Sequence, residues 1–258
     1  MYKKSLSMHL KSAFQYRAST FLVMASQLMV TLAEFLSVLM MMTQFKVIGG
    51  YPLANVCIMF GIIMIGFPAS ECFGRGFDMF SKQVRTGELD RLFLRPRTIF
   101  AQTFCADFEL SKMGKILIGT IALIYGLIAS NISWNFAKVL CVILCVGGSF
   151  TIGLSALIIN AGITIFTHDD IEIMNIITNG SREVSQYPLT IYPKWFRTFF
   201  TVILPLACVN YLPILFLIDA PNANVFANML APVWGSLVVI PAILFFNFAL
   251  TKYTSSGT

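Results

Sequence analysis

The sequence predicts an all-α membrane protein in which six helices cross the bilayer. Of its 258 residues, 57% are hydrophobic and only 12% are charged, whereas a soluble domain carries about 25% charged residues. The mean hydropathy is +0.78, and apolar runs long enough to cross a membrane recur along the chain. The sequence shows no internal repeat or low-complexity segment, so we expect one membrane domain over residues 1–258.

The six spans are placed on the apolar runs. They cover about residues 20–43, 53–73, 114–130, 136–166, 196–218 and 229–250. Charged side chains precede the third run, so we expect its helix to begin near residue 102, outside the membrane core. In the fourth run, Gly147, Gly148 and Gly153 indicate bending or close helix packing. The prolines of the last two spans are tolerated where neighbouring groups satisfy the freed backbone carbonyls.

The distribution of Lys and Arg sets the predicted orientation. With the N-terminus in the cytoplasm, 16 of the 18 lie in inner segments, and only Lys46 and Lys138 lie in outer ones. Cytoplasmic loops carry such an excess, so both termini and the polar residues 167–195 are predicted to be cytoplasmic. The same bias accounts for the net charge of +6, which would otherwise suggest a nucleic-acid partner; we expect none.

Residues 2–18 are predicted to form an amphipathic helix on the inner membrane surface. One face carries apolar residues at every fourth position, namely Leu6, Leu10, Phe14 and Ala18. The rest of the helix carries the cations Lys3, Lys4, Lys11 and Arg17. A basic helix with one apolar face is typical of binding to an anionic leaflet, so membrane lipid is an expected partner.

Few residues are suited to catalysis. The only histidines are His9 and His168, and the sequence contains neither an HExxH zinc motif nor a Walker A loop. Ser149 and Ser155 have no histidine in another span to activate them, which favours a role in helix packing. A solvated helix start explains the one acidic cluster better than metal or phosphate chemistry does; this cluster is His168, Asp169, Asp170 and Glu172. We expect no enzyme activity, metal, nucleotide site or disulfide in this chain.

Polar side chains within the apolar spans are the candidates for a translocation path. Glu34 lies deep in the first span, where an ionised carboxylate costs about 3 kcal/mol or more. Such a group faces a bundle interior, a water-filled cavity or a subunit interface. Glu34 therefore either contacts substrate or is protonated and hydrogen-bonded structurally, and Asn160 and Asn210 leave the same two alternatives open.

The stretch 74–97 combines two short helical faces with mixed charge. Before Gly87, one face carries Phe77, Phe80 and Val84; after Gly87, a second face carries Leu89, Leu92 and Phe93. A helix that lies on lipid is one explanation. An anionic leaflet would repel the acids of this stretch, so a groove on a partner protein is favoured; these acids are Asp78, Glu88 and Asp90.

Two blocks of sequence resemble one family. The run VRTGELDRLFLRPR, at residues 84–97, and residues 186–218 are similar to the two recognisable blocks of exporter-type permeases among the type-2 ABC transporters. The resemblance implies that this chain pairs with an identical or related permease in a bacterial cytoplasmic membrane. It also implies two separate ATPase subunits, which would bind ATP and Mg. It does not name a substrate.

The resemblance also implies that the stretch 74–97 is a coupling helix that docks on the ATPase. Carried over by position, the coupling residues are Arg85, Glu88, Leu89, Asp90, Arg91, Leu92 and Arg95. On this basis, Leu89→Asp or Leu92→Asp is expected to leave the protein inserted while uncoupling ATP hydrolysis from transport. The alternative is a non-transporting membrane protein, either an intramembrane enzyme that uses residues 168–170 or a sensory or assembly subunit.

Overall fold

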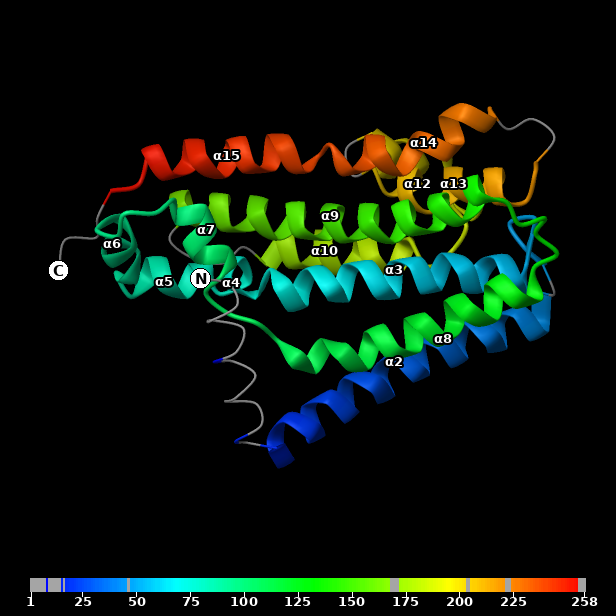
Figure 1. Ribbon diagram of the computed structural model, residues 1–258, viewed down its shortest axis with the longest axis horizontal. Coiled ribbons are helices and arrows are strands. Elements are labelled where there is room, and N and C mark those ends of the chain that lie inside the picture. Colours follow the sequence, from blue (N-terminus) through cyan, green and yellow to red (C-terminus); the bar gives the residue numbers. More distant parts are fainter. Residues whose placement is uncertain are drawn as a thin grey trace.

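The computed structural model describes residues 8, 15, 17–45, 47–167, 172–202, 205–220 and 224–254. Most of them are helical, which confirms the all-α class. Five helices have the length and apolar composition to cross a membrane, and a bent helix pair raises the number to six if it counts as one span. The long helices lie side by side along the long axis of the molecule (Figure 1).

The five long spans agree closely with the predicted ones. They are α2 (Arg17–Phe45), α3 (Leu53–Phe73), α8 (Met113–Ala129), α9 (Phe136–Thr167) and the successive helices α14 (Val225–Ser236) and α15 (Val239–Thr251). Of the predicted amphipathic segment 2–18, only residues 8, 15, 17 and 18 are described, so its placement on a membrane surface stays a prediction.

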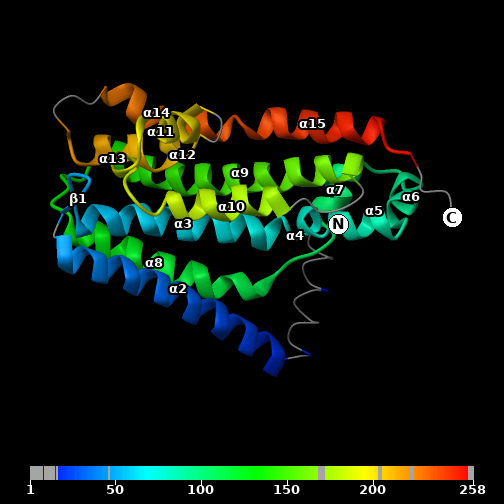
Figure 2. The same cartoon turned by 180° about the vertical axis from the view of Figure 1, so that it is seen from behind.

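The bundle has two distinct ends (Figures 1 and 2). At the hairpin end, strands β1 (Val47–Ile48) and β2 (Tyr51–Pro52) pair antiparallel between α2 and α3. At the opposite end, which we call the α6 end, four short helices follow α3. These are α4 (Arg75–Asp78), α5 (Phe80–Arg85), α6 (Glu88–Phe93) and α7 (Ile99–Phe104).

Helix α3 is the centre of the bundle, and small residues let its neighbours approach it closely. A Cβ at Gly61 would lie 2.6 Å from Cβ of Leu123 in α8, and Gly66 lies against Ser149 of α9. Ser149 Oγ donates a hydrogen bond of 3.1 Å to the Ile62 carbonyl, a contact that suits the predicted packing role. By contrast, α2 lies at the periphery with many large apolar side chains exposed, as expected for a helix against lipid or another subunit.

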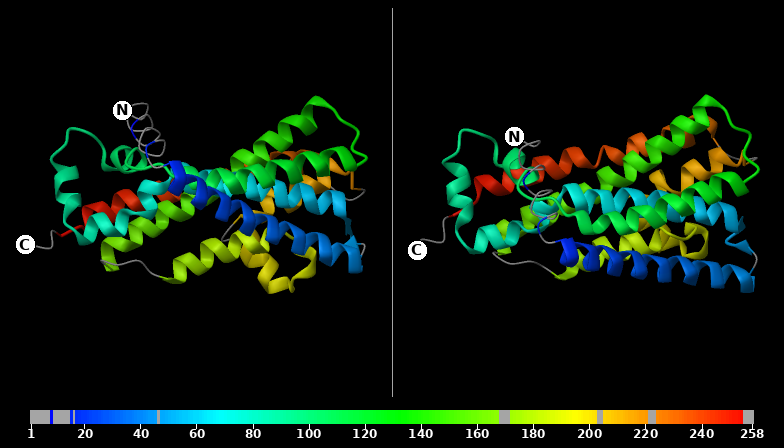
Figure 3. Two further views of the ribbon diagram at one scale, coloured as in Figure 1. Left: turned by 90° about the horizontal axis from the view of Figure 1, so that it is seen from below. Right: turned by 60° about the horizontal axis from the view of Figure 1, so that its bottom comes forward.

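The polar segment after α9 takes a different course from the predicted one. Helix α10 (Glu172–Val184) starts near the α6 end and runs beside α3 and α9 towards the hairpin (Figure 2). Just beyond it, in the 3-10 turn η2 (Leu189–Ile191), Thr190 Oγ1 donates a hydrogen bond of 2.9 Å to the Gly49 carbonyl in the hairpin. Residues 172–195 therefore run along the bundle (Figure 3), whereas the sequence predicted that residues 167–195 stay on the cytoplasmic side.

The bundle accommodates this polar helix because other elements provide partners for Arg182 and for the carbonyl at its end. Arg182 is buried and pairs with Glu71 of α3. Asn210 Nδ2 donates a hydrogen bond to the Ser185 carbonyl, where α10 has just ended. Hydropathy does not recognise such a helix, because the partners that make its burial favourable are distant in sequence.

The fifth apolar run, predicted as one span over 196–218, is divided into three helices. They are α11 (Lys194–Val202), α12 (Leu206–Val209) and α13 (Tyr211–Leu217), and the two halves of the run form an angle of 75°. Pro205 lies at this break, where a proline lacks the N–H that would continue a helix. Helix α11 lies in the half of the bundle that contains the hairpin (Figure 2). With Lys194 and Arg197 moved there, the other 14 inner cations still outnumber the outer ones, and the orientation stays a prediction.

The third span begins later than expected. Helix α7 ends at Phe104, residues 105–109 are not helical, and a 3-10 turn, η1 (Leu110–Lys112), leads into α8. The expectation of one helix from residue 102 is wrong because this link makes its own bonds. Asp107 Oδ1 accepts a hydrogen bond from the Phe108 N–H, and the Glu109 N–H donates to the Cys72 carbonyl.

An ion pair closes the hairpin end. Lys138 of α9, whose side chain is 3% exposed, donates to Asp219 Oδ2 at 2.7 Å and to Ser133 Oγ at 3.1 Å. The hydrogen bond from Lys138 lowers the pKa of Asp219. The pair therefore stabilises this junction fully above the unfolded pKa of about 3.9 and is lost only as the pH falls through the lower folded pKa.

Candidate functional site

The group of short helices at the α6 end is anchored on the spans. Phe77, Phe80, Val84 and Leu89 are buried in one hydrophobic cluster with side chains of α9 and α15. The ring centroid of Phe246 in α15 lies 5.5 Å from that of Phe77 and 5.3 Å from that of Phe80. The predicted apolar faces therefore form, but they point into the protein.

Two residues fix the shape of this element. Gly87, between α5 and α6, has a φ of 70°, a left-handed conformation that glycine adopts without a Cβ clash. Gln102 of α7 is buried, and its Nε2 donates hydrogen bonds of 3.1 Å to the Leu92 carbonyl and 3.0 Å to the Arg97 carbonyl. The end of α6 and the loop after it are thus held by α7.

The outward side of α6 carries charges and a large apolar group. The exposed residues of α6 and of the positions next to it include Arg85 at the end of α5, Glu88, Arg91 and Phe93 in α6, and Leu94 and Arg95 just after it. Leu94 is 86% exposed. An exposed leucine surrounded by charged side chains, on an element held rigidly from behind, is typical of a surface that docks on another protein.

Some of the predicted coupling residues lie on the inner side. Leu89 is fully buried and Leu92 packs partly buried against the same cluster. Leu94 was not predicted as a contact residue because the prediction considered only the apolar residues that share one helical face. Its position off that face was the available signal, since an apolar residue opposite a buried stripe must be exposed.

The last residue of α6 also contacts the chain beyond α15. The ring of Phe93 stacks on that of Tyr253, with centroids 5.7 Å apart and planes inclined by 17°. Burial and the neighbouring Asp90 carboxyl raise the pKa of Tyr253. This stacking ties α6 to the chain just after α15, while Phe246 of α15 contacts Phe77 of α4 and Phe80 of α5.

A network of charges joins α3, η1 and α10 next to the short helices of the α6 end. Glu71, near the end of α3, pairs with Lys112 Nζ at 2.6 Å and with Arg182 of α10 at 3.4 Å. Three elements of the chain, α3, η1 and α10, are therefore linked close to the point where α3 ends and α4 begins. Neither Glu71 nor Arg182 was singled out from sequence, because Glu71 sits one turn from the end of an apolar run and its partners are far along the chain.

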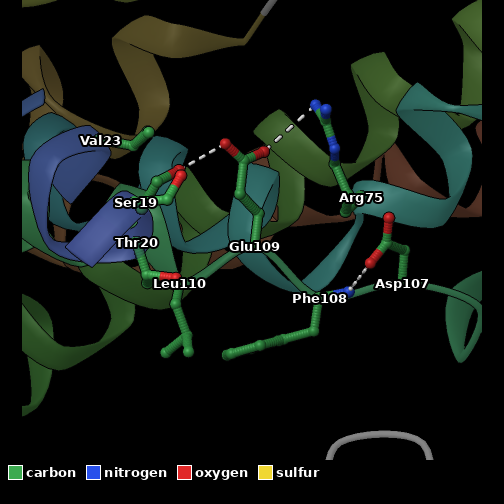
Figure 4. Close-up of a pocket in the computed structure, with 9 residues that line it drawn as sticks. Ser19, Thr20, Val23, Arg75, Asp107, Phe108, Glu109 and Leu110 are labelled. Atoms are coloured by element: carbon green, nitrogen blue, oxygen red, sulfur yellow. Dashed lines mark hydrogen bonds and ion pairs between the residues drawn. The ribbon is translucent and has the colours of Figure 1, made fainter. Parts of the chain in front are cut away.

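Arg75 extends the network into α4. Its Nη1 lies 2.5 Å from Asp78 Oδ2 and 3.2 Å from Glu109 Oε2, and Ser111 Oγ donates to Glu109 Oε1 at 2.5 Å. Figure 4 shows Arg75 reaching Glu109 beside the start of α2, at a cavity of about 350 Å³. Burial raises the pKa of Asp78, and the Arg75 guanidinium opposes this rise.

The three candidates for a translocation path lie on different elements. Glu34 is in α2, Asn160 in α9 and Asn210 between α12 and α13. In the described part of the chain, no hydrogen bond or ion pair joins any two of them. Asn210 supports the end of α10, whereas Glu34 Oε2 and Asn160 Oδ1 are buried without a hydrogen-bond partner. Their role in a path stays a prediction.

The alternative site at 168–170 lies outside the described residues, as does the side chain of Glu172. Among the residues that are described, no group of three His, Cys, Asp or Glu side chains is placed to hold a metal ion. The six cysteines are free thiols.

These features define a class, namely a multi-pass membrane protein with a polar helical element fastened to one end of its bundle. The model of the family described as ABC-2 family transporter protein matches residues 28–257, so the chain belongs to this family. The family supplies membrane permease subunits of ABC transporters, which are not themselves catalytic and generally work with ABC ATPase partners. Comparisons with curated proteins and with solved structures return no match.

Proposed function

We propose that this chain is the permease subunit of an ATP-driven exporter in a bacterial cytoplasmic membrane. It forms the substrate path as a dimer with an identical or related chain, and separate ATPase subunits, which bind ATP and Mg, drive it through α6. One observation carries the proposal: α6 presents Leu94 and charged residues outward while its opposite face is buried against α9 and α15.

The contacts behind α6 suggest how a push from the ATPase reaches the membrane. Phe77 and Phe80 transmit displacement to Phe246 of α15, because close-packed aromatic rings resist compression. The charges of Arg75 and Glu109 connect α4 to the link before α8, and Glu71 connects α3 to α10. Movement of the short helices would therefore shift several spans together, as alternating access requires.

Leu94→Asp is expected to lower ATP-driven transport at least about tenfold, because a central apolar contact of a docking surface contributes at least 1.4 kcal/mol or so. The measurement is transport together with ATP hydrolysis in vesicles that contain the permease and its ATPase. Thr98→Asp is the matched control. It adds the same charge four residues further along the same exposed loop, at the N-cap of α7. Transport by Leu94→Asp at the wild-type rate would remove α6 as the docking point.

A further inference from the structure

A group of cations lies inside the bundle near the α6 end, between α3, α8 and α10. Lys112, Lys115 and Arg182 surround the single carboxylate of Glu71, which pairs directly with Lys112 and Arg182. Lys115 acts electrostatically on Glu71 and is repelled by Arg182. It is only 6% exposed, yet in the described part of the chain it makes neither a hydrogen bond nor an ion pair.

The other acids nearby do not neutralise Lys115. Asp78 and Glu109 both lie against Arg75. Glu34 acts on Lys115 electrostatically, but less strongly than Glu71 does and without forming an ion pair. Three cations therefore share one close carboxylate, and a buried charge without a close partner costs several kcal/mol or so.

Arg182 also has an unused donor. Its Nε is buried and lacks a hydrogen-bond partner, and its nearest guanidinium nitrogen is 3.4 Å from Glu71. Next to the Glu71–Lys112 pair, a cavity of about 130 Å³ is lined by hydroxyl and amide groups as well as charges; its polar members are Ser70, Glu71, Asp78, Lys112, Thr178 and Asn179. The cavity has room for several waters or one small polar group; Lys115 and Arg182 are not part of its lining but interact with Glu71, which is.

We propose that Lys115 and Arg182 bind the anionic headgroup, a phosphate or a carboxylate, of an amphiphilic molecule that enters the bundle at its α6 end. Such a group accepts charge-assisted hydrogen bonds from both cations and relieves their mutual repulsion. The residues of α8 that follow Lys115 are almost all apolar and suit the tail of the same molecule. That this molecule is the transported substrate rests on the proposed function. Its binding to Lys115 and Arg182 needs no ATPase.

The test uses the purified full-length chain in nanodiscs of zwitterionic lipid, with dodecyl phosphate as the probe and dodecyl maltoside as the uncharged control. Dodecyl phosphate is expected to raise the thermal unfolding midpoint of the wild type. Lys115→Met should weaken its apparent affinity at least about tenfold, and Lys115→Arg should retain it. Lys82→Met, which removes an exposed cation at the same end, should behave as the wild type. An equal response of Lys115→Met and wild type, or no response of the wild type, would overturn the proposal.

Two further arms identify the source of the headgroup. If nanodiscs that contain phosphatidylglycerol abolish the response to dodecyl phosphate, a membrane phospholipid occupies the anion site; if the response persists, the site prefers a different amphiphile. Either result supports the anion site. Leu94→Asp should bind the probe as the wild type does, so a failure of the α6 docking proposal leaves this test intact, and the reverse also holds.

Discussion

Leu89→Asp is expected to unfold the short helices at the α6 end and to destabilise the protein by about 4 kcal/mol or more. The substitution removes a fully buried leucine from the cluster around Phe246 and puts a carboxylate in its place. Thermal unfolding gives the loss of stability. Limited trypsin digestion reports on the local structure, because α5, α6 and the following loop contain Arg85, Arg91 and Arg95 as cleavage sites.

Leu94→Asp is the matched control for Leu89→Asp, because it introduces the same residue five positions along at an exposed site. Its unfolding free energy should change by no more than about 0.5 kcal/mol. The sequence predicted that Leu89→Asp leaves the protein inserted while uncoupling ATP hydrolysis from transport; the full burial of Leu89 predicts a loss of stability as well. A variant with Leu89→Asp that melts as the wild type does, while transport is lost, would place Leu89 on the docking surface after all.

Glu71→Ala is expected to destabilise the protein by about 3–5 kcal/mol, because it leaves the buried Lys115 and Arg182 and the partly exposed Lys112 without a close carboxylate. Thermal unfolding in zwitterionic lipid measures the effect. Glu88→Ala, which removes an exposed acid of α6, should stay within about 0.5 kcal/mol of the wild type.

A double variant shows whether the loss comes from the ion pairs. When Glu71→Ala is combined with Lys112→Met, the two effects should fall short of additivity by at least about 1 kcal/mol, since residues in direct contact are coupled. Additive effects would mean that the pair of Glu71 and Lys112 does not hold the network together.

The sequence predicted the apolar spans well because their signal is local. The second predicted span, 53–73, coincides with α3, and the bounds of α8 and α9 differ from the prediction by one residue. Twenty or so consecutive apolar residues need a membrane or a large core whatever lies elsewhere in the chain. The family resemblance, drawn from residues 84–97 and 186–218, is likewise confirmed by the family match.

The course of α10 was not predictable in this way because its burial depends on distant partners. Arg182 is placed by Glu71, Asn210 by the Ser185 carbonyl, and Thr190 by the Gly49 carbonyl. Each of these contacts joins segments at least 25 residues apart. Hydropathy therefore assigned the segment to the cytoplasmic side between two spans, and the charge network that includes Glu71 was not anticipated.

The two faces of α6 were predicted more successfully than their roles. Periodicity grouped Leu89 with Leu92 and Phe93; Leu89 and Leu92 do pack in the inner cluster, whereas Phe93 is 47% exposed. Periodicity does not say whether an apolar face meets the rest of the chain or a partner. For α6, this depends on residues more than 150 positions away: Leu89 is buried in the cluster that contains Phe246, and Phe93 stacks on Tyr253.

The central claim is that the outward face of α6 contacts an ABC ATPase, and photo-crosslinking tests it most directly. A benzophenone amino acid is placed at position 94, and as a control at Ile128, which is 80% exposed near the hairpin end of α8. Irradiation of membranes that contain the assembled transporter should yield an ATPase adduct from position 94 and none from position 128. Equal yields from the two positions, or an adduct from position 128 alone, would contradict the account.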